Sequence, residues 1–280
     1  MFRFAPFLLL LSPLLLAGCI DVVDVKIPEG QPLLAVEGEI TDQPGPYLIT
    51  LTKTVPYFDE VALPRVQGAV LTLADNEGHR ETLREVRPGT YATSTLQGKI
   101  GNQYVLTIQA EGEEYRAETE IRRTPEIDSI RAEYRPRAST QNEGYYILYY
   151  GAETPGVGDY YRFKVFHNGV LLNRPNDLIV TNDEQVDGNY IGGVELTNEK
   201  GANDQPFAKG DRVRVQAESL PRDYFYFLSE MVTQLNNVGL FATPPANVRT
   251  NIRNVRPGSE KAAVGYFAGH TVRADSLVIR

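Results

Sequence analysis

Short β-prone runs separated by turn residues recur along most of the chain, and they constrain its fold more than any other feature. Several of them alternate apolar and polar side chains, as in Tyr47–Thr52, where Ile49 and Leu51 share one face. Turn sequences such as Asp75-Asn76-Glu77-Gly78 and Arg87-Pro88-Gly89 stand between the runs. This pattern predicts a mainly β protein built from antiparallel, immunoglobulin-like β-sandwiches.

The runs fall into two groups on either side of Arg122–Glu126, a charged segment with a proline that we take as a domain boundary. The first group predicts strands at Leu33–Glu39, Tyr47–Thr52, Ala69–Ala74, Glu81–Val86, Gln103–Ala110 and Glu114–Ile121. The second predicts strands at Ile127–Tyr134, Tyr145–Tyr150, Tyr160–His167, Leu178–Thr181, Val213–Ser219, Ala263–His270 and Thr271–Ile279. We therefore expect two β-sandwich domains, over residues 32–123 and 127–280.

The carboxy-terminal domain is rich in tyrosine and contains the one helical pattern. Eleven of the 16 tyrosines lie after residue 126. Pro221–Val238 has apolar residues at helical spacing, which predicts one amphipathic helix near 221–238 whose apolar stripe packs in the core. The stripe consists of Tyr224, Phe227, Leu228, Met231, Leu235 and Val238. Tyr226 lies off the stripe, so we expect it to be exposed.

Two strand patterns of this domain give finer predictions. Tyr145–Tyr150 is apolar on both faces, which predicts a central position in a sheet. In Tyr160–His167, apolar residues alternate with Arg162 and Lys164, which predicts that these two charged side chains face solvent.

The amino terminus has the pattern of a secretory signal peptide that ends at a cysteine. Arg3 precedes the apolar segment Phe7–Leu16, and Ala17-Gly18-Cys19 follows with the only cysteine of the chain. This arrangement resembles a bacterial lipoprotein signal, in which residues 1–18 are removed and Cys19 is acylated, leaving residues 19–31 as a tether. The alternatives are an ordinary signal peptide or a short membrane helix, although the apolar segment is shorter than the roughly 20 residues of a membrane span.

The residues after Cys19 indicate which membrane, and which face of it, holds the protein. Ile20 stands where aspartate would favour retention at the inner membrane, so we expect the outer membrane. Asp21 and Asp24 resemble the surface-export signals of some lipoproteins, which favours the cell surface over the periplasmic face. No second long apolar segment occurs, so two or three acyl chains would be the membrane attachment.

Composition and motifs argue against several classes of function. A net charge of −8 without a stripe of Lys and Arg argues against nucleic-acid binding. With Cys19 acylated, no thiol remains for a disulfide, a metal or catalysis. The histidines His79, His167 and His270 form no zinc-binding pair, and we expect the first two to be solvated at turns. Nucleophile-elbow and dinucleotide motifs are also lacking, so we expect no catalytic residues and no cofactor.

Two short patterns suggest calcium binding and modification. The acidic segment Asn182–Asn189 fails as an EF-hand, but Asp183 and Asp187 remain candidate ligands of a looser calcium site, against the simpler interpretation of a solvated loop. Ser129 and Ser276 each lie in an Asp-Ser-aliphatic sequence, a pattern that some bacteria use for O-glycosylation, against the interpretation of plain strand residues.

Two segments near the ends of the mature chain have a distinctive sequence. The first is Pro32–Asp42 followed by Gly45-Pro46-Tyr47, and the second is Asn237–Ile252 followed by Gly265-Tyr266-Phe267. Together they resemble a family of bacterial lipoproteins called domain of unknown function 4249. The family has no established chemistry. The resemblance implies a context, since such lipoproteins are often encoded beside TonB-dependent outer-membrane transporters as accessory subunits.

The second segment permits two interpretations. Gly265 predicts a strand with a close backbone approach, and the whole segment would then be a latch that closes the carboxy-terminal domain. In the other interpretation, Phe241, Pro244 and Pro245 form an exposed apolar lip that docks on a transporter.

These observations lead to one expected function and two alternatives. We expect a non-enzymatic outer-membrane lipoprotein that assists a TonB-dependent transporter or captures a small ligand or glycan for it. Tyr226, Phe241, Pro244 and Pro245 are the candidate partner contacts. The first alternative is a structural or adhesive surface protein that holds other surface proteins or polysaccharide. The second is a hydrolase with a dispersed site, which would require His167 or His270 beside two carboxylates in one cleft.

Overall fold

β-Strands make up nearly all of the regular structure, as the recurrent β-prone runs predict. The computed structural model describes residues 31–56, 59, 61–237 and 247–280, and residues 32–280 belong to one unit. The first eight strands are β1 (Leu34–Thr41), β2 (Leu48–Lys53), β3 (Val70–Asp75), β4 (Arg80–Thr82), β5 (Arg84–Arg87), β6 (Thr90–Ala92), β7 (Gln103–Ala110) and β8 (Glu113–Glu120). The next seven are β9 (Ser129–Arg135), β10 (Gly144–Ala152), β11 (Tyr160–His167), β12 (Val170–Leu171), β13 (Ile179–Asn182), β14 (Tyr190–Glu195) and β15 (Arg212–Ser219). After them come helix α1 (Arg222–Leu235), β16 (Arg253–Asn254), β17 (Ala263–His270) and β18 (Val272–Val278).

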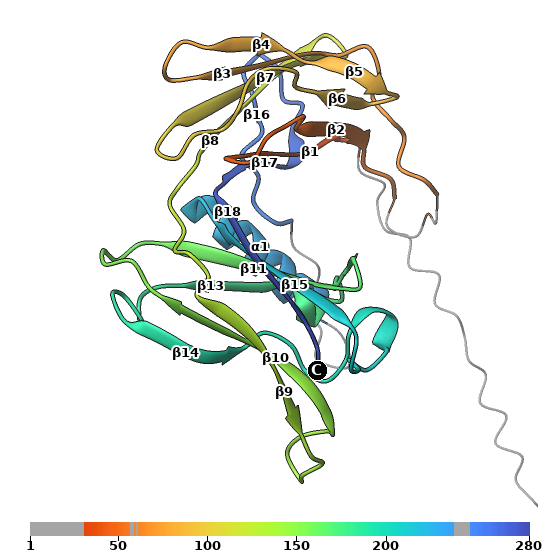
Figure 1. The fold of residues 1–280 in the computed structure, drawn as a ribbon. Helices are drawn as coiled ribbons and strands as arrows, with labels where there is room; N and C mark the ends of the chain where they lie inside the picture. The colour runs from red at the N-terminus through yellow and green to blue at the C-terminus, as the bar shows by residue number, and fades with distance from the viewer. Residues whose placement is uncertain (1–30, 57–58, 60, 238–246) are drawn as a thin grey trace, which may run out of the picture. The chain divides into compact units, whose positions relative to one another are not determined.

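The strands form four mostly antiparallel sheets (Figure 1). Two sheets contain the amino-terminal strands, in the orders β17-β1-β2-β6-β5 and β16-β8-β7-β3-β4. The other two have the orders β14-β10-β9 and β12-β11-β15-β18, with β13 also paired to β11. Strand β10 lies in the centre of its sheet, which confirms the prediction made from its two apolar faces.

The carboxy-terminal segment does not stay with the strands that precede it. Strand β17 pairs in parallel with β1, from Leu34 opposite Ala263 to Thr41 opposite His270, and β16 pairs with β8. The next strand, β18, returns to pair with β15. Our expectation that β17 belongs with the strands of residues 127–280, and closes that domain as a latch, was therefore wrong. Pairing between segments so distant in sequence leaves no trace in local periodicity.

Gly265 allows the close approach of β17 to β1. Its φ of +91° is unfavourable for other residues, and a Cβ atom there would lie 2.0 Å from the carbonyl oxygen of Val36. The sequence-based prediction of a close backbone approach at this glycine is confirmed.

Three hydrophobic clusters fill the interior of residues 32–280. The first combines side chains of both amino-terminal sheets, including Ile49, Leu71 and Leu106. The second combines the sheets of β10 and β11, including Ile147 and Val215. The third lies around α1 and contains the buried residues Tyr160, Leu220, Tyr224, Phe227, Leu228, Tyr266 and Ala268. Because Phe267 belongs to the first cluster and Tyr266 to the third, β17 is shared by two cores.

Helix α1 confirms the amphipathic pattern as far as Met231, which is half-buried against the third cluster, while Val238 of the predicted stripe lies outside the described residues. Tyr224, Phe227 and Leu228 are buried, whereas Leu235 near the end of the predicted stripe is exposed. Pro221 directly precedes the helix, as its missing N–H group allows.

Candidate functional site

A cavity of about 330 Å³ lies within the carboxy-terminal strands, and it is the best candidate for a functional site. Its wall contains aromatic side chains from β10 and β11, namely Tyr149, Tyr161 and Phe163. Aliphatic side chains of β14 and β15, including Ile191 and Ala217, complete the apolar part. A mainly apolar cavity of this size with a few polar groups is typical of small-molecule sites.

Glu153 supplies the carboxylate of this cavity. It directly follows β10 and is 4% exposed. Its Oε1 accepts a hydrogen bond from the Tyr161 hydroxyl at 2.6 Å and one from the Thr154 N–H at 3.0 Å. Burial raises the pKa of Glu153, and the nearby carboxylates of Asp159 and Asp183 raise it further. Burial and the Glu153 carboxylate likewise raise the pKa of Tyr161.

Three buried acidic residues meet beside the cavity. One carboxylate oxygen from each of Glu153, Asp159 and Asp183 lies within 4.8 Å of the others. Asp159 is held by the Arg123 guanidinium at 2.8 Å, and Asp183 accepts the Gly158 N–H at 2.9 Å and 3.0 Å. Asp159 thus has a basic partner, whereas Glu153 and Asp183 accept hydrogen bonds from neutral groups.

This arrangement partly supports the calcium hypothesis for the acidic segment. Asp183 does lie among carboxylates, but Asp187 is not part of the group and instead accepts the Gly156 N–H at 2.6 Å. Glu153 and Asp159 were not predicted as site residues. Asp159 directly precedes the predicted strand Tyr160–His167, which was an available signal, whereas Glu153 lies three residues after the predicted strand Tyr145–Tyr150 and directly follows only the observed β10. Calcium binding at Asp183 stays a prediction.

Thr124 adds an unsatisfied polar group to the cavity wall. Its side chain lines the cavity, is 8% exposed, and its Oγ1 has no hydrogen-bond partner among the described residues. A buried hydroxyl without a partner loses about 1–3 kcal/mol of solvation, so a bound ligand that pairs with it would recover this energy.

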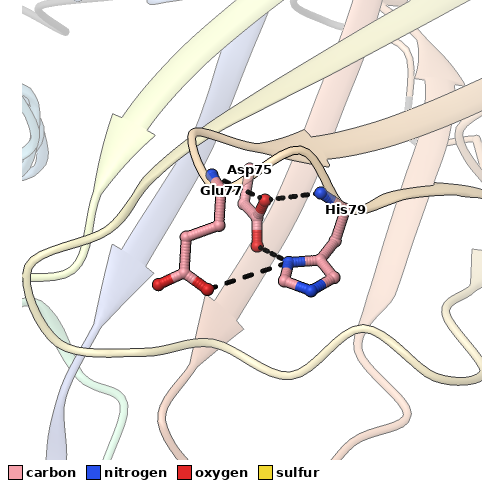
Figure 2. Close-up of side chains that lie close together, drawn as sticks. All are labelled: Asp75, Glu77 and His79. Atoms are coloured by element: carbon pink, nitrogen blue, oxygen red, sulfur yellow. Dashed lines mark hydrogen bonds and ion pairs between the residues drawn. The ribbon is translucent and has the colours of Figure 1, made fainter.

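A second group of possible metal ligands lies in the turn between β3 and β4 (Figure 2). There Asp75 Oδ1 accepts the backbone N–H groups of Glu77 and His79, and Asp75 Oδ2 lies 2.8 Å from His79 Nδ1. Lys99 pairs with Glu77 at 2.6 Å. These contacts use the same lone pairs that a metal would need, so the group is best explained as a stabilised turn. His79 is exposed at this turn, as predicted.

A buried charge cluster around Arg162 corrects the prediction that this residue faces solvent. Arg162 is 6% exposed and contacts Glu218 at 2.7 Å, Glu39 at 3.0 Å and the Tyr224 hydroxyl at 3.3 Å. Lys164 pairs with Glu218 at 2.8 Å. Polar alternation in β11 was correct, but its charged face packs against opposite charges from β1 and β15 rather than water.

The other two histidines are buried, so the expectation of a solvated His167 was wrong. His167 Nε2 lies 2.8 Å from Asp211 Oδ2, and its Nδ1 accepts the Ala202 N–H. His270 is fully buried, with Nδ1 2.9 Å from the Ser219 carbonyl and Nε2 3.9 Å from Glu39 Oε1. Burial lowers the pKa of His270. It lies among carboxylates but in the packed interior, so a substrate has no access to it.

The remaining predicted site residues are dispersed. Tyr226, expected to be exposed, is half-buried on α1 with the guanidinium of Arg249 4.9 Å from its ring. Ser129 lies half-buried in β9 and Ser276 exposed in β18, where O-glycosylation remains a prediction. Cys19, Phe241, Pro244 and Pro245 lie outside the described residues, and so do the predicted signal peptide and the acylated tether up to residue 30.

Comparison with known protein families identifies the chain over nearly its whole length. A family model described as domain of unknown function (DUF4249) matches residues 20–276. The chain belongs to this family. Comparison with curated proteins gives no match. Among the residues that the structure describes, no helix combines the length and the apolar character needed to cross a membrane.

Parts of the two segments that resemble the DUF4249 family are neighbours in the fold. Pro32–Asp42 contains β1, and Gly265-Tyr266-Phe267 lies in β17, its parallel partner. Residues 238–246 of the second segment lie outside the described residues.

Proposed function

We propose that this DUF4249 protein captures a small ligand in the cavity between β10 and β11, without catalysis. The observation that supports it best is the cavity of about 330 Å³ with aromatic walls, a buried carboxylate and an unpartnered hydroxyl. Water occupies about 30 Å³ per molecule in the liquid, so the volume corresponds to roughly eleven waters, enough for a small organic molecule.

The setting of this activity is part of the same proposal. Acylation of Cys19 would hold the protein at the outer membrane, on the cell surface, as an accessory of a TonB-dependent transporter that receives the ligand. Residues 32–280 would then form immunoglobulin-like β-sandwiches from the four sheets, consistent with cores that combine side chains of paired sheets. Tyr226, Phe241, Pro244 and Pro245 are the proposed transporter contacts.

Ligand capture is tested by filling the cavity. Ala217 lines the cavity and is 2% exposed, whereas Ala274 lies exposed on the neighbouring strand β18. The native protein is purified from outer membranes in detergent, and native mass spectrometry determines any small molecule that remains bound. We expect a bound ligand that is lost in Ala217→Leu and retained in Ala274→Leu. Equal retention by both variants would contradict capture in this cavity.

The transporter partnership has a separate test. Affinity purification from detergent-solubilised outer membranes should bring down one TonB-dependent transporter. If none is recovered, and deletion of the gene changes cell attachment while ligand uptake is normal, the structural or adhesive alternative is correct instead.

A further inference from the structure

The polar groups of the cavity have an unbalanced charge. Among the described side chains that line it, Glu153 is the one carboxylate and none is a Lys, Arg or His. The other two acidic side chains of the group do not line the cavity: Asp159 binds the Arg123 guanidinium, and Asp183 accepts the Gly158 N–H. A ligand in this cavity therefore meets one acidic group without a basic counterpart in the wall.

Glu153 has capacity left for a ligand. Both of its hydrogen bonds from the protein, from Tyr161 and Thr154, end on Oε1. Among the described residues no donor lies on Oε2, and a carboxylate oxygen accepts up to two hydrogen bonds. A buried carboxylate is stabilised most by a charged donor, because such hydrogen bonds are about twice as strong as neutral ones.

The aromatic walls favour the same kind of ligand. Tyr149 and Phe163 meet edge to face with ring centroids 5.0 Å apart, and Tyr161 adds a third ring. Aromatic faces attract cations by roughly 0.5–2 kcal/mol per contact, most strongly where water is excluded. They also contact apolar carbon, which a bare metal ion would not provide.

We propose that the cavity binds a small organic ammonium ion. Its N–H groups would bond to Glu153 Oε2, its apolar body would lie among Tyr149, Tyr161 and Phe163, and the Thr124 hydroxyl would serve a second polar group. This inference rests on the proposed function of ligand capture and adds the class of ligand. An anionic ligand is disfavoured by Glu153, and a neutral apolar one leaves Oε2 and Thr124 Oγ1 without partners.

Three probes that share one ring test the charge directly. 2-Phenylethylammonium, 2-phenylethanol and phenylacetate carry a positive, a neutral and a negative group on the same phenyl ring. Each is titrated calorimetrically into the acylated protein in detergent, with titration into detergent alone as the blank. We expect the amine to bind at least about tenfold more tightly than the alcohol, which corresponds to about 1.4 kcal/mol, and phenylacetate to bind more weakly than either.

Glu153→Gln and Glu184→Gln form a matched pair of variants. Glu184 is exposed in the same segment as Asp183, so its loss changes net charge equally without changing the cavity wall. We expect Glu153→Gln to weaken amine binding at least about tenfold and to change alcohol binding less than about twofold. Glu184→Gln should leave both nearly unchanged. Glutamine can still accept the Tyr161 hydrogen bond, and melting curves confirm that each variant folds.

The outcomes separate the ligand class from the function. If the alcohol binds as tightly as the amine and Ala217→Leu weakens both, the ammonium inference is wrong and capture in the cavity is retained. If phenylacetate binds most tightly, the ammonium inference is wrong as well. If none of the three binds at millimolar concentration, the ammonium inference is overturned, and the natively bound molecule then decides whether the cavity captures any ligand.

Discussion

Removing the Arg162 guanidinium should destabilise the protein more than any single surface charge change. Arg162 is buried where β11 packs against β1 and α1, and it neutralises two carboxylates. The substitution Arg162→Met keeps a long flexible side chain and removes the charge. It leaves Glu218, whose side chain is 4% exposed, with Lys164 as its remaining basic partner.

The expected loss in the free energy of unfolding depends on the basic partners that the two carboxylates retain. Breaking a buried ion pair by removing one partner typically costs about 3–5 kcal/mol, because a buried charge is left uncompensated. Lys164 still compensates Glu218 in part, so we expect about 3 kcal/mol. The double variant Arg162→Met/Glu218→Met removes both charges and should regain at least half of this loss, since well-packed apolar replacements of buried pairs are often nearly neutral.

Urea unfolding followed by far-UV circular dichroism measures these differences, because the chain has no tryptophan to report on the core. With an m value of about 3 kcal/mol per M, a 3 kcal/mol loss lowers the midpoint by about 1 M. Arg116→Met is the matched control: Arg116 pairs with Glu118 at 3.1 Å, but their side chains are 50% and 69% exposed. Such a pair contributes at most about 1 kcal/mol.

Two results would refute this reasoning. The first is a loss for Arg162→Met no greater than that of Arg116→Met, which would mean that the cluster is hydrated. The second is a double variant whose loss in the free energy of unfolding equals the sum of the losses of Arg162→Met and Glu218→Met measured singly. In that case the energies of Arg162 and Glu218 would be independent, and their 2.7 Å contact would carry no coupling.

Three further predictions concern acid stability, the β1–β17 contact and the anchor. Burial opposes the shift, but positive neighbours lower the pKa of Glu39 to about 2 and also lower the pKa of Glu218. The stability that these carboxylates contribute is present above pH 4.5 and should be lost as the pH falls below it. The urea midpoint of Glu218→Gln should therefore change less between pH 5 and pH 3 than the midpoint of the wild type. Gly265→Ala should lower the free energy of unfolding, measured in urea, clearly more than Gly210→Ala. Both glycines have φ above +90°, a strain of about 1–2 kcal/mol for alanine, but only a Cβ at Gly265 meets backbone atoms, whereas nothing lies within 4 Å of a Cβ at Gly210. Equal losses of free energy in the two variants would show that β17 moves freely. Cys19→Ser should abolish palmitate labelling and release the protein from the membrane fraction, and continued labelling would place the acyl group elsewhere.

Local sequence patterns predicted the strands well where side-chain alternation and turn residues agree. Gln103–Ala110, Tyr160–His167 and Ala263–His270 match β7, β11 and β17 residue for residue. Strands β6, β12, β14 and β16 were missed. Three of them, β6, β12 and β16, have only two or three residues, too few for a period, and β14 contains Gly192 and Gly193, which weaken any β pattern.

Pairing was less predictable than strand position. The sequence suggested one crossing between halves at Arg122–Glu126, but the chain crosses again to reach β17 and once more to reach β18. A strand's own residues show which of its faces is apolar and leave open which strand it pairs with. Arg162 illustrates the same limit for side chains, because a polar face looks alike in sequence whether water or Glu218 covers it.

The candidate site was hidden for a related reason. Its acidic residues lie next to the ends of β10, β11 and β13. Strand β11 pairs with β13, whereas β10 belongs to the neighbouring sheet, so only the packing of the two sheets brings Glu153, Asp159 and Asp183 together. Of the three, Asp183 was found because a run of acidic residues surrounds it in sequence. Glu153, which we consider most important for binding, stands alone among apolar and small residues.

The return of the carboxy-terminal strands β17 and β18 also bears on the cavity, although neither of these two strands lines it. The Arg122 carbonyl accepts hydrogen bonds from the hydroxyls of Ser219, at 2.7 Å, and Thr271, and Thr271 is the residue at which the chain passes from β17 to β18. Residues 123 and 124 follow directly, and they supply the guanidinium that holds Asp159 and the unpartnered hydroxyl of the cavity wall. The crossing between sheets thus fixes the segment that shapes one side of the cavity. In the proposed ligand capture, the crossing from β17 to β18 would therefore act through the position of this wall.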